Sequence, residues 1–124
     1  MRFHDFHLSG YSVSKFGGEI VLDLVSEDSR ETSKVRFSGV AAYHFVHAGS
    51  AIITDITEVP VPQLLKTIGD ELAEWERTLG GLPHWNNDRA KYAATLQENG
   101  YKAWTIVSAI GFEGFIIAEC VEAG

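Results

Sequence analysis

Histidine is the residue type whose spacing in this sequence comes nearest to that of a metal site. Four of the five histidines form two pairs with the same spacing, His4 with His7 and His44 with His47. Four imidazoles would satisfy a tetrahedral zinc ion. Both pairs fall in stretches of strand-like alternation, where side chains three positions apart point to opposite faces. A pair can then hold one ion only if a bulge intervenes or the segment is helical. His4 precedes the clear alternation and is not bound by this rule. The sequence therefore favours exposed or hydrogen-bonded histidines, with no metal and no cofactor.

Acidic side chains offer a second route to chemistry, because two carboxyl groups can act as general acid and general base when burial separates their pKa values. The strand-like segments carry the candidates Asp5, Asp23, Asp55, Glu58 and Glu119. Asp55 and Glu58 are three positions apart, so they diverge in a strand. Asp70 and Glu74 share a face of a predicted helix, but that face lies away from its apolar stripe. Solvated carboxylates are therefore favoured over an acid–base pair.

The sequence contains none of the short motifs that position a nucleophile or a phosphate group. No serine lies in a G-x-S-x-G turn, and neither G-x-G-x-x-G nor the P-loop pattern occurs. Gly80 and Gly81 follow an apolar helical stripe, so they are expected to end a helix rather than to begin one. The single cysteine, Cys120, alternates with Ile116 and Ala118 and is expected to be a small core residue. These observations favour a protein that is not an enzyme.

The loop segment 83–88 departs from simple packing patterns, because it combines a proline, an imidazole, a large aromatic ring and two amides. Tryptophan is a frequent interface anchor, and loops often carry binding residues. His84 and Trp85 are therefore candidates for a recognition patch. A purely structural interpretation is also open, in which Trp85 covers a pair of helices while Asn87 or Asp88 caps the second helix.

The apolar pattern predicts strands, then helices, then strands again. Alternation with period two covers the first half and the end of the chain. The middle follows the 3.6-residue period of amphipathic helices. The predicted strands span residues 6–14, 20–25, 35–46, 52–59, 101–110 and 112–121, and the predicted helices span 62–79 and 88–99. This order favours an α+β fold with a mainly antiparallel sheet of about six strands and two helices packed together on one side or end.

Two further expectations concern burial. The first helix carries an apolar stripe that should face the core, and its members are Leu64, Leu65, Ile68, Leu72, Trp75 and Leu79. The segment 115–118 is apolar at every position, so both of its faces should be covered. We therefore expect the strand 112–121 to be central in the sheet.

Length and composition indicate a single domain over residues 1–124. Seventeen acidic residues against ten lysines and arginines give a net charge of −7, which opposes nucleic-acid binding and favours a basic protein partner. One cysteine requires no oxidising compartment. No stretch approaches the roughly 20 apolar residues that span a bilayer, so we expect a cytoplasmic protein without membrane contact. A homo-oligomer formed through an exposed strand edge stays open.

Three strand segments resemble a group of small uncharacterised bacterial domains. They are Val35-x-Phe37-x-Gly39-Val40-x-x-Tyr43-x-Phe45, Ile52-Ile53-x-Asp55-Ile56-x-Glu58-Val59 and Ile106-x-Ser108-x-Ile110-Gly111-x-x-Gly114-Phe115-Ile116-Ile117-Ala118. More loosely, the chain is similar to the acidic immunity proteins of bacterial toxin systems, which bind and neutralise a toxin without catalysis. The resemblance lies in core and turn residues. It implies a fold and a binding role, and it transfers no catalytic residue.

The function predicted from the sequence is that of a non-enzymatic, acidic protein-binding domain, with toxin neutralisation as one form of that role. The candidate contact residues are Asp70, Glu71, Glu74, His84 and Trp85. The alternative is an enzyme or a small-ligand-binding protein with a pocket between the sheet and the helices. That pocket would use His4, Asp5 or His84.

Overall fold

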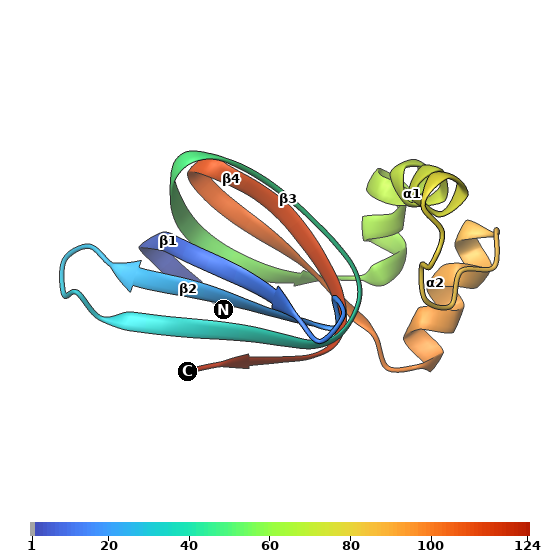
Figure 1. Ribbon diagram of the computed structural model, residues 1–124, viewed down its shortest axis with the longest axis horizontal. Helices are drawn as coiled ribbons and strands as arrows, with labels where there is room; N and C mark the ends of the chain where they lie inside the picture. The colour runs from blue at the N-terminus through green and yellow to red at the C-terminus, as the bar shows by residue number, and fades with distance from the viewer. Residues whose placement is uncertain (1) are drawn as a thin grey trace.

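The computed structural model describes the backbone of residues 2–124 and the side chains of residues 6–124, so the predictions for His4 and Asp5 lie outside the described side chains. Its elements are β1 (Arg2–Ser14), β2 (Glu19–Ser26), β3 (Thr32–Val59), α1 (Val61–Thr78), α2 (Arg89–Glu98) and β4 (Lys102–Ala123) (Figure 1). The strands form one antiparallel sheet, and the two helices lie together at one end of it. This arrangement confirms the predicted α+β class.

The described sheet has four strands, so the prediction of about six is wrong. β3 is 28 residues long and β4 is 22, and both continue through glycines that lie between the predicted strands. Gly49 in β3 and Gly111 in β4 have positive φ angles of 66° and 79°, which let the paired strands bend. At this bend, β3 places residues 48–51 opposite Gly111 alone. The predicted order was four strands, two helices and two strands. The observed order is three strands, two helices and one strand.

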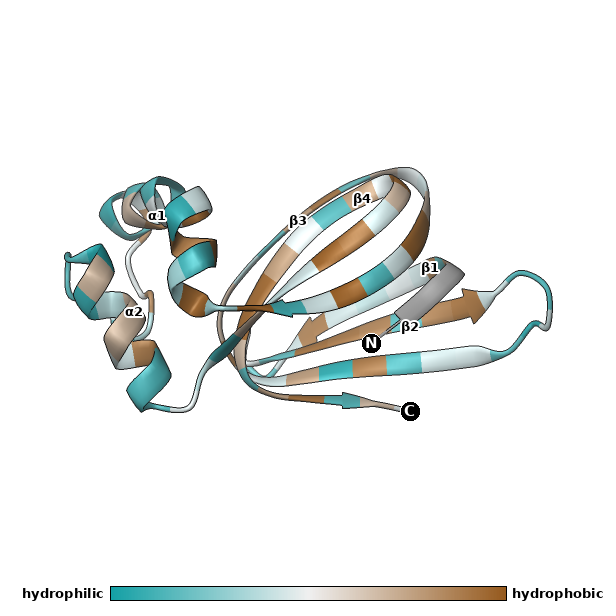
Figure 2. Ribbon diagram, turned by 180° about the vertical axis from the view of Figure 1, so that it is seen from behind, coloured by the Kyte–Doolittle hydropathy of each residue, from teal (hydrophilic) through white to brown (hydrophobic). Residues whose placement is uncertain are grey.

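β3 curls the sheet by pairing with each of the other strands. Its first part pairs with β2, and its last part pairs with β1, where Phe6 lies opposite Ile53. Hydrophobic and hydrophilic residues alternate along much of β3 and β4 (Figure 2), which gives the curled sheet an inner and an outer face. Among the described pairings, β4 pairs with β3 alone and lies at the edge of the sheet. The prediction that the segment 112–121 is central is therefore wrong.

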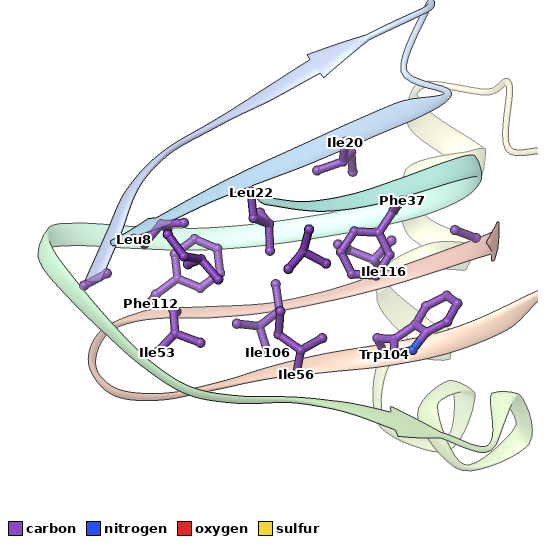
Figure 3. Packing of buried hydrophobic residues seen from close by; sticks show 14 residues of the cluster. Leu8, Ile20, Leu22, Phe37, Ile53, Ile56, Trp104, Ile106, Phe112 and Ile116 are labelled. Atoms are coloured by element: carbon purple, nitrogen blue, oxygen red, sulfur yellow. The ribbon is translucent and has the colours of Figure 1, made fainter. Parts of the chain in front are cut away.

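Two clusters of buried side chains explain why this edge strand is apolar on both faces. One cluster fills the inside of the curled sheet, where side chains from all four strands converge (Figure 3). The other lies between the outer face of the sheet and the helices. Ile116 and Ala118 of β4 belong to the inner cluster, whereas Phe115 and Ile117 belong to the outer one. Helices, rather than a second neighbouring strand, supply the burial that the sequence indicated.

Cys120 is exposed, which contradicts its predicted place in the core. The paired strands bend again at Gly39 of β3, whose φ angle is +64°. Ala118 of β4 belongs to the inner cluster before this bend, and Val121 packs against the same cluster after it. These two residues are three positions apart, so the inward-facing side chains change from even to odd positions at the bend. Cys120, opposite Ser38, is therefore on the outer face despite its alternation with Ala118.

Helix α1 has the predicted buried stripe except at its C-terminal end. Residues up to Leu72 are buried along the stripe, but Trp75 is half-buried and Leu79, the C-cap residue, is 82% exposed. The chain turns away immediately afterwards at Gly80 and Gly81, both with positive φ. The apolar stripe of α1 therefore continues about one helical turn beyond the part of the helix that the rest of the domain covers.

Helix α2 begins after Asp88, one of the two residues considered as its cap. The Asp88 side chain accepts a hydrogen bond from the backbone N–H of Lys91 at 3.1 Å. Its buried residues are Tyr92, Ala93 and Leu96. Neither helix combines the length and the hydrophobicity that a membrane-spanning segment requires.

Candidate functional site

Three of the five predicted contact residues lie around one hollow beside α1. Asp70, Glu74 and Trp85 line this hollow, which has a volume of about 460 Å³. Both carboxylates are paired within the chain, Asp70 with Arg89 at the start of α2 and Glu74 with Arg77 of α1. These exposed ion pairs offset part of the negative charge that the sequence places here.

Glu71 and His84 lie away from that hollow. Glu71 lines a separate hollow beside β3 and β4. The His84 ring packs edge-on against Tyr101, with ring centroids 5.5 Å apart. Trp85 is half-buried and packs edge-on against Tyr92 at 5.0 Å, so it covers the helical pair. The structure therefore brings together three of the predicted contact residues and separates the other two.

The two histidines of β3 lie on opposite faces of the strand, as parity predicts. His44 packs against Trp75 on the helix side, with ring centroids 5.2 Å apart. His47 packs against Phe112 on the inner side at 5.6 Å. Within the described part of the chain, no three His, Cys, Asp or Glu side chains converge as metal ligands.

Two of the candidate carboxylates of the strands, Asp23 and Asp55, have local hydrogen-bond partners. Asp23 accepts a hydrogen bond from Lys34 Nζ at 2.9 Å. Asp55 accepts one from the Thr57 hydroxyl at 3.0 Å. Glu58, which was predicted to diverge from Asp55, is exposed. Asp23 and Asp55 therefore bond to residues of their own or the adjoining strand rather than to each other.

A groove lined by aromatic and aliphatic side chains crosses the junction between the sheet and α1. It consists of two adjoining hollows of about 360 and 460 Å³ that have three lining residues in common. The first hollow extends to the β1–β2 turn, and the second extends to the last part of β1. We call this surface the aromatic groove and define it by Tyr11, Phe16, Tyr43, Phe45, Trp75 and Leu79.

Two side chains of the aromatic groove are far more exposed than is usual for apolar residues. Phe16 is fully exposed in the β1–β2 turn, where its φ angle is +59°, and Leu79 is 82% exposed at the end of α1. Burying a side chain of either type stabilises a protein by about 1.5–3 kcal/mol. Because Phe16 and Leu79 stay exposed when this chain folds, most of that stabilisation can be gained only by binding a partner. Exposed apolar side chains gathered around one groove indicate a binding surface.

Four of the five rings that define the groove, all except Phe16, are held in place by ring contacts. Tyr11 and Tyr43 contact Phe45, with centroids 5.0 and 5.3 Å apart. Trp75 is stacked on Phe115 of the outer cluster, with an interplanar angle of 7° and a centroid separation of 6.3 Å. Because these rings are already ordered, binding a partner would cost little further conformational entropy.

The charged side chains that line the first hollow are Lys15 and Glu76. Lys15 Nζ pairs with Glu19 Oε2 at 3.1 Å. Glu76 Oε2 accepts a hydrogen bond from the backbone N–H of Leu82 at 2.7 Å, which fixes the carboxylate beside the α1–α2 loop. Among the described residues, no lysine, arginine or histidine forms an ion pair with Glu76. Within the described part of the chain, Glu76 is therefore a charged lining residue that has a backbone N–H as its partner but no cation.

Two tyrosines of the helical layer have raised phenol pKa values. Burial is the main cause at Tyr92, and the neighbouring Tyr101 and Glu76 raise its pKa further. Burial is also the main cause of the raised pKa at Tyr101, and Glu119 contributes through its charge and a hydrogen bond. Tyr92 is fully buried, and its hydroxyl has no hydrogen-bond partner among the described residues.

Replacing Tyr92 by phenylalanine is expected to leave the free energy of unfolding unchanged at pH 7, or to raise it by up to about 1 kcal/mol, because the variant lacks a buried hydroxyl without a partner. The raised folded-state pKa makes the native chain lose stability as the pH rises above about 10, where the unfolded tyrosine ionises first. Tyr92→Phe should lose less stability than the native chain over this pH range. Urea unfolding at pH 7 and at about pH 10.5 measures the free energy of unfolding under each condition. The exposed Tyr11→Phe is the control, and a large loss for Tyr92→Phe at pH 7 would contradict this account.

None of the groove residues was among the predicted contact residues, although two local signals could have indicated them. Phe16 directly precedes Gly17 in the segment between the first two predicted strands, where polar residues are usual. Leu79 directly precedes the Gly80–Gly81 pair, at the end of the helical stripe. A large apolar residue next to a glycine that ends a helix or forms a turn can lie outside the core of its own domain and stay exposed.

The aromatic groove joins an apolar surface to one fixed carboxylate, a combination suited to recognising a partner with apolar and cationic groups. Comparison of the chain with models of protein families and with curated proteins finds no match. The functional interpretation therefore depends on the geometry of the groove.

Proposed function

We propose that this protein is a protein-binding domain that recognises its partner through the aromatic groove. The observation that carries this proposal is the exposure of Phe16 and Leu79 beside one groove built from separate segments. Tryptophan and tyrosine, which dominate the binding energy of many interfaces, form much of its lining. The net charge of −7 favours a basic partner through electrostatic steering.

The groove suits a protein partner because it is open and has two adjoining hollows, each able to receive side chains from one surface. The acidic residues Asp70, Glu71 and Glu74, and the loop residues His84 and Trp85, stay candidate contacts at other positions of the helical layer. Neutralisation of a toxin is one form of this function, since covering the working surface of a toxin requires binding alone.

Replacing Leu79 by aspartate is expected to weaken partner binding at least tenfold while the fold stays intact, because the change places a charge in an apolar contact without touching the core. The partner is first captured on the immobilised chain and purified. It is then titrated by calorimetry against the native chain and the variant. Ile110→Asp is the matched control, because Ile110 is also exposed but does not line the groove.

The same titration distinguishes the aromatic groove from the hollow lined by Asp70, Glu74 and Trp85, which we call the acidic hollow. The double variant Asp70→Lys, Glu74→Lys should reduce the salt-dependent part of the affinity and leave most of the binding. If this variant abolishes binding while Leu79→Asp binds like the native chain, the acidic hollow is the interface. A purified partner whose affinity is unchanged by both Leu79→Asp and Phe16→Asp contradicts the proposed role of the groove.

A further inference from the structure

We infer that the segment received by the aromatic groove carries a lysine or arginine beside apolar side chains, and that this cation pairs with Glu76. The inference rests on the proposed protein-binding function and names the chemistry of the partner. It starts from the charges of the first hollow, where Glu76 is the carboxylate among the lining residues.

The cationic side chain that lines the same hollow already has a carboxylate partner, which it shares with Arg36. Lys15 pairs with Glu19 at 3.1 Å, and Glu19 also lies 3.9 Å from Arg36. Arg77, the residue after Glu76, is paired with Glu74. Within the described part of the chain, Glu76 therefore has a backbone hydrogen-bond donor but no cationic partner.

The position of Glu76 on α1 adds a second reason to expect a cation. Helix α1 ends at Thr78, so Glu76 lies in its last turn. The C-terminal end of a helix carries a partial negative charge, which disfavours a carboxylate and favours a cation at that position. A lysine or arginine of the partner would interact favourably with both the carboxylate and the end of the helix.

The walls of the hollow suit the rest of such a segment. Leu79 and Phe16 present exposed apolar surface beside Glu76, where the methylene stem of a lysine or arginine can pack. Trp75 and Tyr43 line the same hollow and supply aromatic rings, which also attract cations. A cationic side chain flanked by apolar or aromatic residues matches each of these features.

The test uses a library of random 12-residue peptides displayed on phage and selected on the native chain. We expect the enriched peptides to carry a lysine or arginine within two residues of a large apolar side chain. The best of them is synthesised, together with a version in which norleucine replaces the cationic residue. Both peptides are titrated by calorimetry against the native chain, Glu76→Gln, Glu74→Gln and Leu79→Asp.

Glu76→Gln is expected to weaken the cationic peptide about tenfold and to leave the norleucine peptide unchanged, because glutamine keeps an acceptor for the Leu82 N–H but lacks the charge. Glu74→Gln is the matched control and should bind both peptides like the native chain, since Glu74 is not a lining residue of the aromatic groove. Circular dichroism of each variant verifies the fold.

The other outcomes separate this inference from the proposed function. Peptides that lose binding with Leu79→Asp, but lack a cation or ignore Glu76→Gln, would overturn the cation pairing and leave the groove as a binding surface. Peptides that bind Leu79→Asp like the native chain would overturn both. A selection that enriches no peptide would also overturn the inference, because a groove built for a linear segment should retain some member of the library.

Discussion

Leu72→Ala is expected to lower the free energy of unfolding by about 3–5 kcal/mol, the range for a fully buried leucine whose cavity cannot collapse. Leu72 is fully buried in the outer cluster, between the helices and the sheet. Leu79 is the matched control because it lies two turns further along the same stripe and is exposed. Leu79→Ala should change stability by less than about 0.5 kcal/mol. Urea unfolding of both variants, followed by far-ultraviolet circular dichroism, measures the difference.

The same experiment tests whether helices and sheet unfold together. Neighbouring residues of β4 alternate between the two clusters, with Ile116 in the inner one and Phe115 and Ile117 in the outer one. Loosening either cluster therefore disturbs the strand that supports the other. We expect one unfolding transition for Leu72→Ala, coincident by circular dichroism and by tryptophan fluorescence. Two separated transitions, or equal costs for Leu72→Ala and Leu79→Ala, would contradict this packing.

The helices could be predicted from the sequence nearly to the residue because local signals fix their ends. Pro62 lies in the first turn of α1, the Gly80–Gly81 pair follows its last turn, and Asp88 caps α2. Each of these signals acts within a few residues of the helix end that it determines. The structure moves the predicted bounds of 62–79 and 88–99 only slightly, to Val61–Thr78 and Arg89–Glu98.

The strand count could not be predicted in the same way, because a glycine that bends a strand and a glycine that ends one look alike locally. Gly49 and Gly111 lie opposite each other only because β3 and β4 pair across the two intervening helices. The edge position of β4 was missed for a related reason. The apolar run 115–118 shows that both faces are covered, but not whether a helix or a strand covers them.

The aromatic groove was missed because the sequence shows which residues could be buried, not where the covering elements end. Trp75 and Leu79 continue the stripe that buries Leu72, so their spacing predicts the same environment. Only the three-dimensional arrangement leaves them at the margin of the sheet. The acidic residues Asp70 and Glu74 were correctly expected on the face away from the stripe, but their pairing with arginines could not be predicted from that face alone.

Gly111→Ala is expected to lower the free energy of unfolding by about 3–5 kcal/mol, or to prevent folding, because left-handed backbone strain and steric overlap act together. Its φ angle of +79° disfavours any residue with a Cβ atom. A Cβ atom here would also overlap the carbonyl oxygen of Ser50 on the facing strand, and backbone cannot move aside as a flexible side chain can. Urea unfolding or, for a variant that does not accumulate, the yield of soluble protein measures the effect.

Gly49→Ala separates the two contributions, because Gly49 lies in the same bend with a similar φ angle of +66° but has open space where its Cβ atom would lie. It should cost only about 1 kcal/mol, the strain of the backbone alone. Equal costs at the two glycines would show that β3 does not approach Gly111 closely.

The bend also places Phe112 against Phe45 of the aromatic groove, with ring centroids 5.2 Å apart. If Gly111→Ala folds at all, it should therefore bind the partner more weakly than Gly49→Ala, since the strands that carry the groove would be displaced from the inner cluster.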